Sequence, residues 1–304
     1  MKVLLKSATI VDVTSKYHLK KKDVLIEKGK IAQISDSIEV DQKVKTVQLD
    51  NLHISQGWFD PSVSFGEPGF EERETIKNGL KVAASSGFTD VAVNTNTDPV
   101  TDSKGHIKYL LSEAEKSATT LHPIGAMTLR SEGKDLAELF DMNTAGAIAF
   151  YDYKKPVSNA NLLKIALQYT ERFDGLIQSF PLDESVARNG LMNEEETSTR
   201  LGLKGIPALS EELQISRDLY LLEYTGGKLH IPTISTAKAV DLIRKAKKKG
   251  LQVSCSVSIS NLFLDDMILE SFDTHYKLMP PLRTKSDTKA LLKGLQDGTI
   301  DGVS

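Results

Sequence analysis

The stretch ERETIKNGLKVAASSGFTDVAV, residues 72–93, contains a helix and a strand separated by a glycine. Its first part places apolar residues such as Ile76 and Leu80 at the spacing of one helix face, which predicts a helix from about Glu72. Gly87 predicts the end of this helix, and the apolar run after it is typical of a buried strand. The stretch is therefore one repeat of an alternating α/β pattern.

The same unit recurs along the chain. Residues 145–150 form an apolar run that leads to a predicted helix from about Ser158. A later helix can be capped by Ser235 or Thr236, and another apolar run follows it. The predicted strands number eight and lie near Phe59, Val91, Ile124, Ile148, Ile177, Leu229, Val253 and Ile300. Strands that alternate with helices form parallel sheets, and eight of them predict an α/β fold of the TIM-type (β/α)8 barrel class.

The first part of the chain has a different pattern. Short β-type runs, with a turn at Gly29, predict a small β-sandwich-like domain over residues 1–56, and the barrel occupies residues 57–304. The eighth predicted strand lies at the end of the sequence, with no helix after it. We therefore expect that the barrel is incomplete at the C-terminus and that the sequence is a fragment of a longer protein.

The composition excludes several classes of protein. The formal net charge is -3 and the one lysine-rich stretch, residues 245–249, is short, so we expect no nucleic-acid partner. No apolar run reaches the roughly 18 residues that span a bilayer, so we expect no membrane segment. The single cysteine, Cys255, cannot form an internal disulfide, and the N-terminal apolar run is too short for a signal peptide. These features favour a cytoplasmic location.

Five stretches together resemble a known family. Residues 57–71 read GWFDPSVSFGEPGFE and resemble the first barrel strand of dihydroorotases, G-x-x-D-x-H-x-H-x-R-E-P-G. The other four stretches, with the family patterns they resemble, are residues 96–99 (N-T-x-P), 190–194 (M-N-E), 201–207 (L-G-L-x-G-I-P) and 276–283 (Y-K-x-N-P-P-L-R). The chain is similar to class I dihydroorotases of the amidohydrolase superfamily. This resemblance implies a metallo-dependent hydrolase barrel over residues 57–304.

The resemblance implies a zinc site in active members, and this chain departs from the family at the ligand positions. Ser62 and Ser64 stand where the family has two histidines on one side of a strand. Phe180 and Thr233 stand at two further histidine positions. Zinc is usually held by thiolate, imidazole or carboxylate groups, which none of these four side chains supplies. We therefore predict no metal and no other cofactor.

Other site positions are partly retained. Asn96 matches a substrate-binding asparagine, whereas Gly66 replaces the family's substrate-binding arginine and Met279 replaces an asparagine. Asp60 and Asp152 match site aspartates, and without a metal we expect each to hydrogen-bond nearby backbone rather than act as an acid. The prediction is a vestigial site that contains no catalytic residue.

Three functions remain open. The first, which we favour, is a catalytically inactive dihydroorotase-like protein of pyrimidine biosynthesis. The resemblance to inactive dihydroorotase chains implies that it is a structural partner of aspartate carbamoyltransferase or self-associates. The second is an active or altered cyclic-amide hydrolase that interconverts carbamoyl-aspartate and dihydroorotate, using Asp152 and a metal held by unrecognised groups. The third is a free-standing interaction protein.

Overall fold

The structure is a computed structural model that describes residues 2–304. The chain divides into two compact units, one that ends at Trp58 and one that begins at Phe59. Within residues 2–304, no helix has the length and apolar character needed to cross a membrane.

The first unit is a single mixed sheet. Its strands are β1 (Lys2–Val11), β2 (Lys21–Glu27), β3 (Lys30–Ser35), β4 (Lys45–Gln48) and β5 (His53–Ser55). They lie in the order β3-β2-β1-β4, and β5 also pairs with β1. The β2–β3 hairpin turns at Lys28 and Gly29, whose φ values of 50° and 76° are those that a type I′ turn requires.

The second unit contains the eight-stranded sheet. Its strands are β6 (Trp58–Val63), β7 (Phe88–Val93), β8 (Thr120–Gly125), β9 (Ala149–Phe150), β10 (Leu176–Gln178), β13 (Lys228–Ile231), β14 (Val253–Val257) and β15 (Gly302–Val303). They lie side by side in chain order, and the sheet is a parallel, nearly closed barrel. The prediction of eight barrel strands is confirmed.

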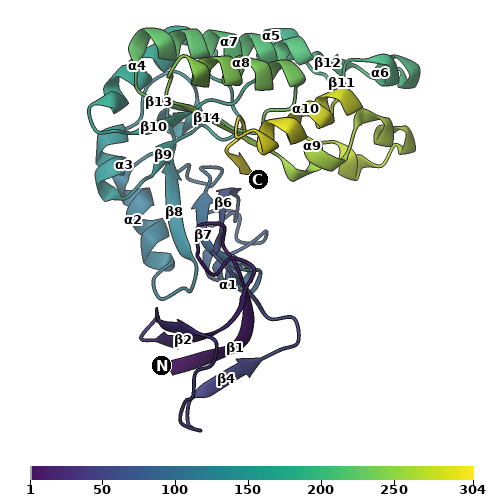
Figure 1. The fold of residues 1–304 in the computed structure, drawn as a ribbon. Coiled ribbons are helices and arrows are strands. Elements are labelled where there is room, and N and C mark those ends of the chain that lie inside the picture. Colours follow the sequence, from purple (N-terminus) through teal and green to yellow (C-terminus); the bar gives the residue numbers. More distant parts are fainter. Residues whose placement is uncertain (1) are drawn as a thin grey trace. The chain divides into compact units, whose positions relative to one another are not determined.

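Helices alternate with these strands. They are α1 (Ile76–Ser85), α2 (Lys104–Glu113), α3 (Leu139–Ala145), α4 (Ala160–Glu171), α5 (Glu184–Ala187), α6 (Glu196–Leu201), α7 (Ala208–Thr225), α8 (Ala237–Lys248), α9 (Ile259–Phe263) and α10 (Lys285–Gln296). Short 3-10 turns are η1 (Leu129–Ser131), η2 (Asp266–Ser271) and η3 (Thr274–Tyr276). Helices α4, α7 and α8 cover one side of strands β10, β13 and β14 (Figure 1).

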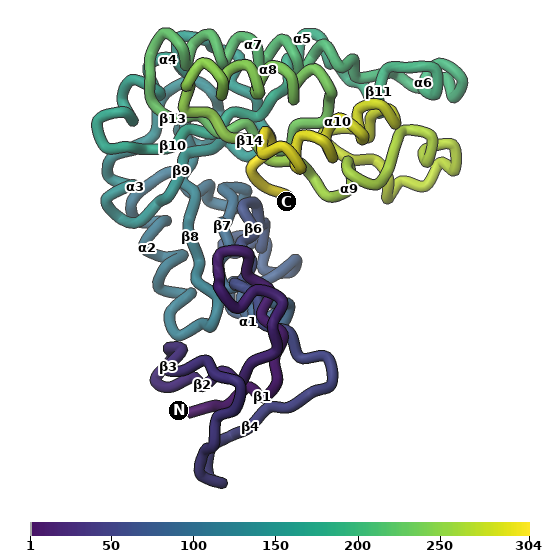
Figure 2. The backbone as a smooth tube through the Cα atoms, viewed as in Figure 1, coloured from purple at the N-terminus to yellow at the C-terminus, as the bar shows by residue number. Residues whose placement is uncertain are grey.

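A small two-stranded sheet interrupts this alternation after α5. It pairs β11 (Met192–Asn193) with β12 (Gly205–Ile206), and α6 lies between them in the chain. The tube in Figure 2 shows that the α6 segment lies beside the yellow-green stretch that contains η2, with which it is in contact. Residues 190–194 and 201–207, two of the family stretches, therefore form one substructure.

Side-chain caps set the helix boundaries. Helix α1 begins at Ile76, later than the predicted start near Glu72, because the Glu67 carboxylate accepts the Ile76 N–H at 2.7 Å and Thr75 is the N-cap. Helix α8 begins after Thr236, whose hydroxyl accepts the Ala239 N–H at 3.1 Å. Of the two candidate caps, Ser235 and Thr236, the structure has Thr236 at the N-cap position.

Candidate functional site

Two strand-end serines face the same neighbour. The Asn94 side chain donates from Nδ2 to Ser62 Oγ at 3.0 Å and to Ser64 Oγ at 3.4 Å. The Ser64 hydroxyl donates in turn to Asn96 Oδ1 at 3.0 Å. Ser62 and Ser64 therefore contact the same side chain. We name these four residues, Ser62, Ser64, Asn94 and Asn96, the strand-end cluster.

Asn94 is the member of this cluster that sequence reasoning missed. Its side chain is 1% exposed, and its Oδ1 is the one buried side-chain atom of residues 2–304 that lacks a hydrogen-bond partner. Turning the amide over would offer this oxygen to Ser62 and leave Nδ2 unpaired instead. In either orientation, one polar atom of the Asn94 amide lacks a hydrogen-bond partner. Asn94 stands two residues before Asn96, and this i, i+2 alternation was the available signal.

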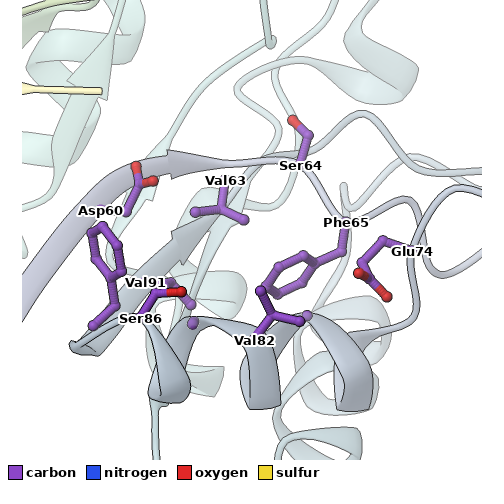
Figure 3. A pocket seen from close by; sticks show the side chains of 11 residues that line it. Asp60, Val63, Ser64, Phe65, Glu74, Val82, Ser86 and Val91 are labelled. Carbon is purple, nitrogen blue, oxygen red and sulfur yellow. The ribbon is translucent and has the colours of Figure 1, made fainter. Parts of the chain in front are cut away.

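Asp60 lies on β6, and its carboxylate hydrogen-bonds to the backbone. Its Oδ1 accepts the backbone N–H of Ser62 at 3.0 Å. Asp60 and Ser64 also line a cavity of about 290 Å³ between β6 and α1. In Figure 3, Val63 and Phe65 turn toward α1, whereas Asp60 and Ser64 project from the opposite side of the strand. The lining contains no lysine, arginine or histidine, so the cavity does not suit an anionic substrate.

The loop after β6 excludes the side chain that the family has there. Gly66 stands at the position of the substrate-binding arginine and has a φ of 119°, a region that favours glycine. A Cβ atom at Gly66 would lie 2.6 Å from the Phe70 carbonyl oxygen. An arginine at this position would therefore require a different loop conformation.

Phe180 fills the interior of the barrel. It is 2% exposed and packs in an apolar cluster whose other buried members come from neighbouring strands or follow them, namely Ala92, Ile124, Ala149 and Tyr151. Tyr153 and Met279 pack against the same cluster. Tyr153 stands where the family's A-F-x-D-D-G loop has its second aspartate, and Met279 stands where the pattern Y-K-x-N-P-P-L-R has its asparagine. Three positions that are polar in the family thus contribute to one apolar contact region, which we name the mouth cluster: Tyr151, Tyr153, Phe180 and Met279.

Thr233 lies just after β13, near a neutral histidine. Its φ is 51°, and its backbone N–H donates to Ser256 Oγ at 3.2 Å. The same hydroxyl lies 3.2 Å from His230 Nε2, and Ser254 Oγ lies 2.8 Å from His230 Nδ1. Burial lowers the pKa of His230 to about 4, so the ring is neutral at pH 7. Both ring nitrogens of His230 are therefore engaged by serine hydroxyls.

Asp152 is a buried structural anchor. It is 3% exposed, and its Oδ1 accepts the backbone N–H groups of Met127 and Thr128, each at 3.0 Å. Its Oδ2 accepts the Thr128 hydroxyl at 2.5 Å. Burial raises the pKa of Asp152, and these hydrogen bonds oppose that rise. Both carboxylate oxygens therefore accept hydrogen bonds from the loop after β8.

The donor set at the mouth does not fit a zinc ion. The four family ligand positions carry two hydroxyls that are already hydrogen-bonded, a buried phenyl ring and a threonine. Across residues 2–304, no three side chains of the types His, Cys, Asp and Glu come together in a way that could hold a metal. The mouth therefore offers hydrogen bonds and apolar surface, and no metal-dependent step can be assigned to its side chains.

The retained family stretches meet at a buried arginine. The Arg283 guanidinium donates from Nη1 to Asn193 Oδ1 at 2.9 Å and to the Ile206 carbonyl oxygen at 2.6 Å. Its Nε donates to Ser235 Oγ at 3.1 Å. The same guanidinium lies 4.0 Å from the Glu211 carboxylate, and both side chains are 2% exposed. One arginine thus connects three stretches that are distant in sequence.

Glu211 and Asp266 complete this network. Glu211 Oε1 accepts the backbone N–H groups of Ser235 and Thr236 at 2.9 and 3.0 Å, and Asn193 Nδ2 donates to Asp266 at 2.7 Å. We name the five side chains, Asn193, Glu211, Ser235, Asp266 and Arg283, the framework cluster. Its hydrogen bonds give the retained stretches a structural role.

The 96–99 stretch packs closely against the backbone of the loop after β6. Gly69 has a φ of 96°, and a Cβ atom there would lie 2.2 Å from the Asp98 carbonyl oxygen. The Asp98 N–H also donates to the Pro68 carbonyl oxygen at 2.9 Å. The two loops therefore pack backbone against backbone, which explains why this position carries a glycine.

Solved structures define the class of fold. The L-hydantoinase (dihydropyrimidinase) from Arthrobacter aurescens matches with a TM-score of 0.81 and 20% identity, over 99% of this chain and 68% of that chain. A dihydropyrimidinase from Brevibacillus agri NCHU1002 gives a TM-score of 0.76 and 20% identity, over 100% of this chain and 68% of that chain. The protein therefore has a hydantoinase-like α/β barrel with a small N-terminal mixed sheet.

Sequence relatives define the family within this class. The model of the Dihydro-orotase-like family matches residues 53–239. Dihydroorotase from Syntrophus aciditrophicus (strain SB) is 40% identical, and that of Pelotomaculum thermopropionicum is 42% identical. Each alignment covers 100% of this chain and 71% of the relative. The chain belongs to the dihydroorotase-like family, as its motifs indicated.

Proposed function

We propose that this chain is a non-catalytic dihydroorotase-family protein of pyrimidine biosynthesis. The observation that carries the proposal is the burial of Phe180 in the apolar mouth cluster, at a position where the family has a metal-binding histidine. Ser62 and Ser64 support it, because their hydroxyls are hydrogen-bonded to Asn94 and Asn96. Zinc lowers the pKa of bound water from 15.7 to about 7, and a site without zinc forgoes this activation.

Substrate recognition is reduced as well in this proposal. Dihydroorotate is an anion, and the loop at Gly66 has no room for the arginine that the family places there. Met279 offers an apolar side chain instead of an amide, and its contacts are with the mouth cluster. Asn96 remains, but its Oδ1 accepts the Ser64 hydroxyl.

The hydrolase alternative depends on Asp152. An acid or base must reach the substrate, yet both oxygens of Asp152 accept hydrogen bonds from the loop after β8. Releasing this carboxylate would leave two buried N–H groups unpaired, each at a cost of about 1–3 kcal/mol. These contacts favour the non-catalytic function.

An activity assay tests the proposal. The purified chain and the Syntrophus aciditrophicus dihydroorotase are compared in both directions, dihydroorotate hydrolysis and carbamoyl-aspartate cyclisation, with added zinc. We expect the turnover of this chain to be lower than that of the relative by at least about 10⁴-fold, given the share of catalysis that metal-bound water supplies. A turnover within about tenfold of the relative would refute the proposal.

The structural role that we propose for this chain is assembly with aspartate carbamoyltransferase. Glu194, Glu195 and Glu196 are exposed at the start of the α6 segment, where a partner can reach them. Mixing the chain with the carbamoyltransferase of the same organism, followed by size-exclusion chromatography with mass measurement, tests this role. Co-elution at micromolar concentration supports it. Separate elution, with a transferase that is equally active and equally assembled alone, refutes it, and a larger mass of this chain alone would indicate self-association.

A further inference from the structure

A second cavity lies away from the mouth cluster. It has a volume of about 730 Å³ and is formed by the loop after α5, the β11–β12 pair and the first turn of α7. Its charged lining residues are Arg188, Glu194 and Lys204, and Ser185 and Asn189 are polar neighbours. The cavity therefore brings two cations and one carboxylate to one concave surface.

The charged side chains of this cavity have no partner of opposite charge among residues 2–304. Within residues 2–304, neither the Arg188 guanidinium nor the Lys204 ammonium takes part in an ion pair or a side-chain hydrogen bond. Other cations nearby do find partners, since Arg200 pairs with Glu270 and Arg217 pairs with Asp218. Glu194 is also unpaired among residues 2–304, and the three groups together leave a net charge of one positive unit. All three charged groups remain available to a ligand.

The cavity wall is held in a fixed conformation. Arg188 has a φ of 48° and a ψ of -133°, a strained backbone conformation for a residue with a side chain. Its N–H donates to the Glu184 carbonyl oxygen at 2.8 Å, and the Leu191 N–H donates to the Lys204 carbonyl oxygen at 2.8 Å. A Cβ atom at Gly190 would lie 2.5 Å from the Gly205 carbonyl oxygen. The Arg188 and Lys204 segments are thus bound closely to each other before any ligand arrives.

The N-terminal end of α7 adjoins the cavity, and one carboxylate, Glu211, lies in its first turn. This helix has 18 residues, and its N-cap, Pro207, supplies no side-chain hydrogen bond. The first N–H groups of a helix have no partner within the helix and carry partial positive charge. Pro207 and Leu209, at this end, both line the cavity.

We propose that this cavity binds a small anion that also carries hydroxyl or amino groups. Arg188 and Lys204 hold the anionic group, because a guanidinium offers two parallel N–H donors to a phosphate or carboxylate and an ammonium adds a point charge. Glu194 accepts the hydroxyl or amino hydrogens of the same molecule. A sugar phosphate and an acidic amino acid both have this chemistry. The inference is independent of whether the barrel catalyses a reaction.

Isothermal titration calorimetry with defined probes tests the proposal. Inorganic phosphate, ribose 5-phosphate and L-aspartate are titrated into the full chain. We expect binding of ribose 5-phosphate or L-aspartate, and the better of the two identifies the anionic group. Absence of heat with all three probes at millimolar concentration overturns the proposal. So does binding of inorganic phosphate that equals binding of both larger probes, because Glu194 then has no role.

A pair of charge-matched double variants locates the site. R188Q/K204Q removes both cavity cations, and R130Q/K134Q removes two exposed cations from another loop where Arg130 also has a positive φ, of 55°. We expect Kd to rise at least about tenfold in the first variant and less than about twofold in the second. Equal weakening in both variants would show a general charge effect and overturn the proposal. If R188Q/K204Q does not fold, as judged by circular dichroism, K204Q alone replaces it with the same criterion.

Discussion

The guanidinium of Arg283 donates a 2.9 Å hydrogen bond to the side-chain oxygen of Asn193, which lies 90 residues earlier in the chain. The contact joins the loop before α10 to the β11–β12 pair, and both side chains are 2% exposed. Burial lowers the pKa of Arg283, but nearby carboxylates, Glu211 first among them, oppose that shift. The framework cluster therefore depends on this one cation.

Replacing the cation should destabilise the barrel. Arg283→Met leaves the buried Glu211 carboxylate without its opposite charge, and removing one partner of a buried pair costs about 3–5 kcal/mol. The matched control is Arg244→Met, since Arg244 pairs with Asp297 in a more exposed setting and such pairs contribute about 0–1 kcal/mol. Urea denaturation gives both free energies of unfolding. Equal losses in the two variants would contradict the structural role of the framework cluster.

The close backbone approach at Gly69 predicts that an alanine there destabilises the protein more than an alanine at Gly133. Gly69→Ala combines a φ of 96° with a Cβ only 2.2 Å from the Asp98 oxygen, and we expect a loss of about 2–4 kcal/mol from strain and overpacking. Gly133→Ala is the control, because Gly133 has a φ of 69° and open space around its Cβ, so only the backbone cost of about 1 kcal/mol applies. Thermal unfolding of the two variants measures the difference. Similar melting temperatures would show that the two loops separate easily.

Purified protein should contain no stoichiometric zinc. The donor set at Ser62, Ser64, Phe180 and Thr233 supplies no thiolate, imidazole or carboxylate. Elemental analysis after dialysis against zinc and then buffer measures the content, with the 40% identical relative as the positive control. One tightly held zinc per chain, whose removal by a chelator lowers stability, would defeat this prediction.

Restoring the two strand histidines should not restore dihydroorotase activity. In S62H/S64H the phenyl ring of Phe180 still fills the interior, and the loop at Gly66 still has no room for an arginine. Residues that act as a unit lose function non-additively, so repair of two positions should recover less than about 1% of the relative's turnover. Steady-state kinetics with added zinc measures it. A turnover near that of the relative would mean that the mouth cluster does not obstruct the site.

The stability of the barrel should fall in mild acid because of His230. Burial lowers the pKa of this ring to about 4, whereas the unfolded chain protonates it near pH 6.5. The contribution is therefore complete above about pH 6.5 and decreases as the pH falls toward 4, by up to ~3 kcal/mol.

Urea denaturation at several pH values measures this slope, and His230→Gln should flatten it. His53→Gln is the control, since His53 is exposed and its ring contacts the Asn51 carbonyl oxygen instead of a carboxylate. If the wild type and the His230 variant lose stability in parallel, His230 is not the group responsible.

The sequence was sufficient for the barrel because that information is local. Alternating apolar runs and helical spacing gave eight strand positions, and Thr236 and Gly87 gave helix boundaries. The start of α1 was wrong by four residues, because it depends on a contact from Glu67, nine residues earlier. Local spacing does not contain that contact.

The polar networks could not be predicted for the same reason. Glu211 lies in α7 and is buried, and its carboxylate accepts hydrogen bonds from Ser235 and Thr236, 24 and 25 residues later. The sequence indicated that Phe180 stands at a histidine position. Its packing against Tyr153 and Met279 depends on the assembled barrel, which brings these distant residues together. Asn94 was missed because its partners, Ser62 on β6 and Ser64 just after it, lie 32 and 30 residues earlier in the chain.

Within residues 2–304, the framework cluster shares no hydrogen bond with Ser62, Ser64, Phe180 or Thr233. Changes at the barrel mouth therefore leave the hydrogen bonds of the framework cluster in place, so a lineage can alter the chemistry of the mouth and keep these contacts. The same independence makes the barrel a suitable host for engineering. A designer can rewrite the interior around Phe180 and leave the Arg283 contacts untouched.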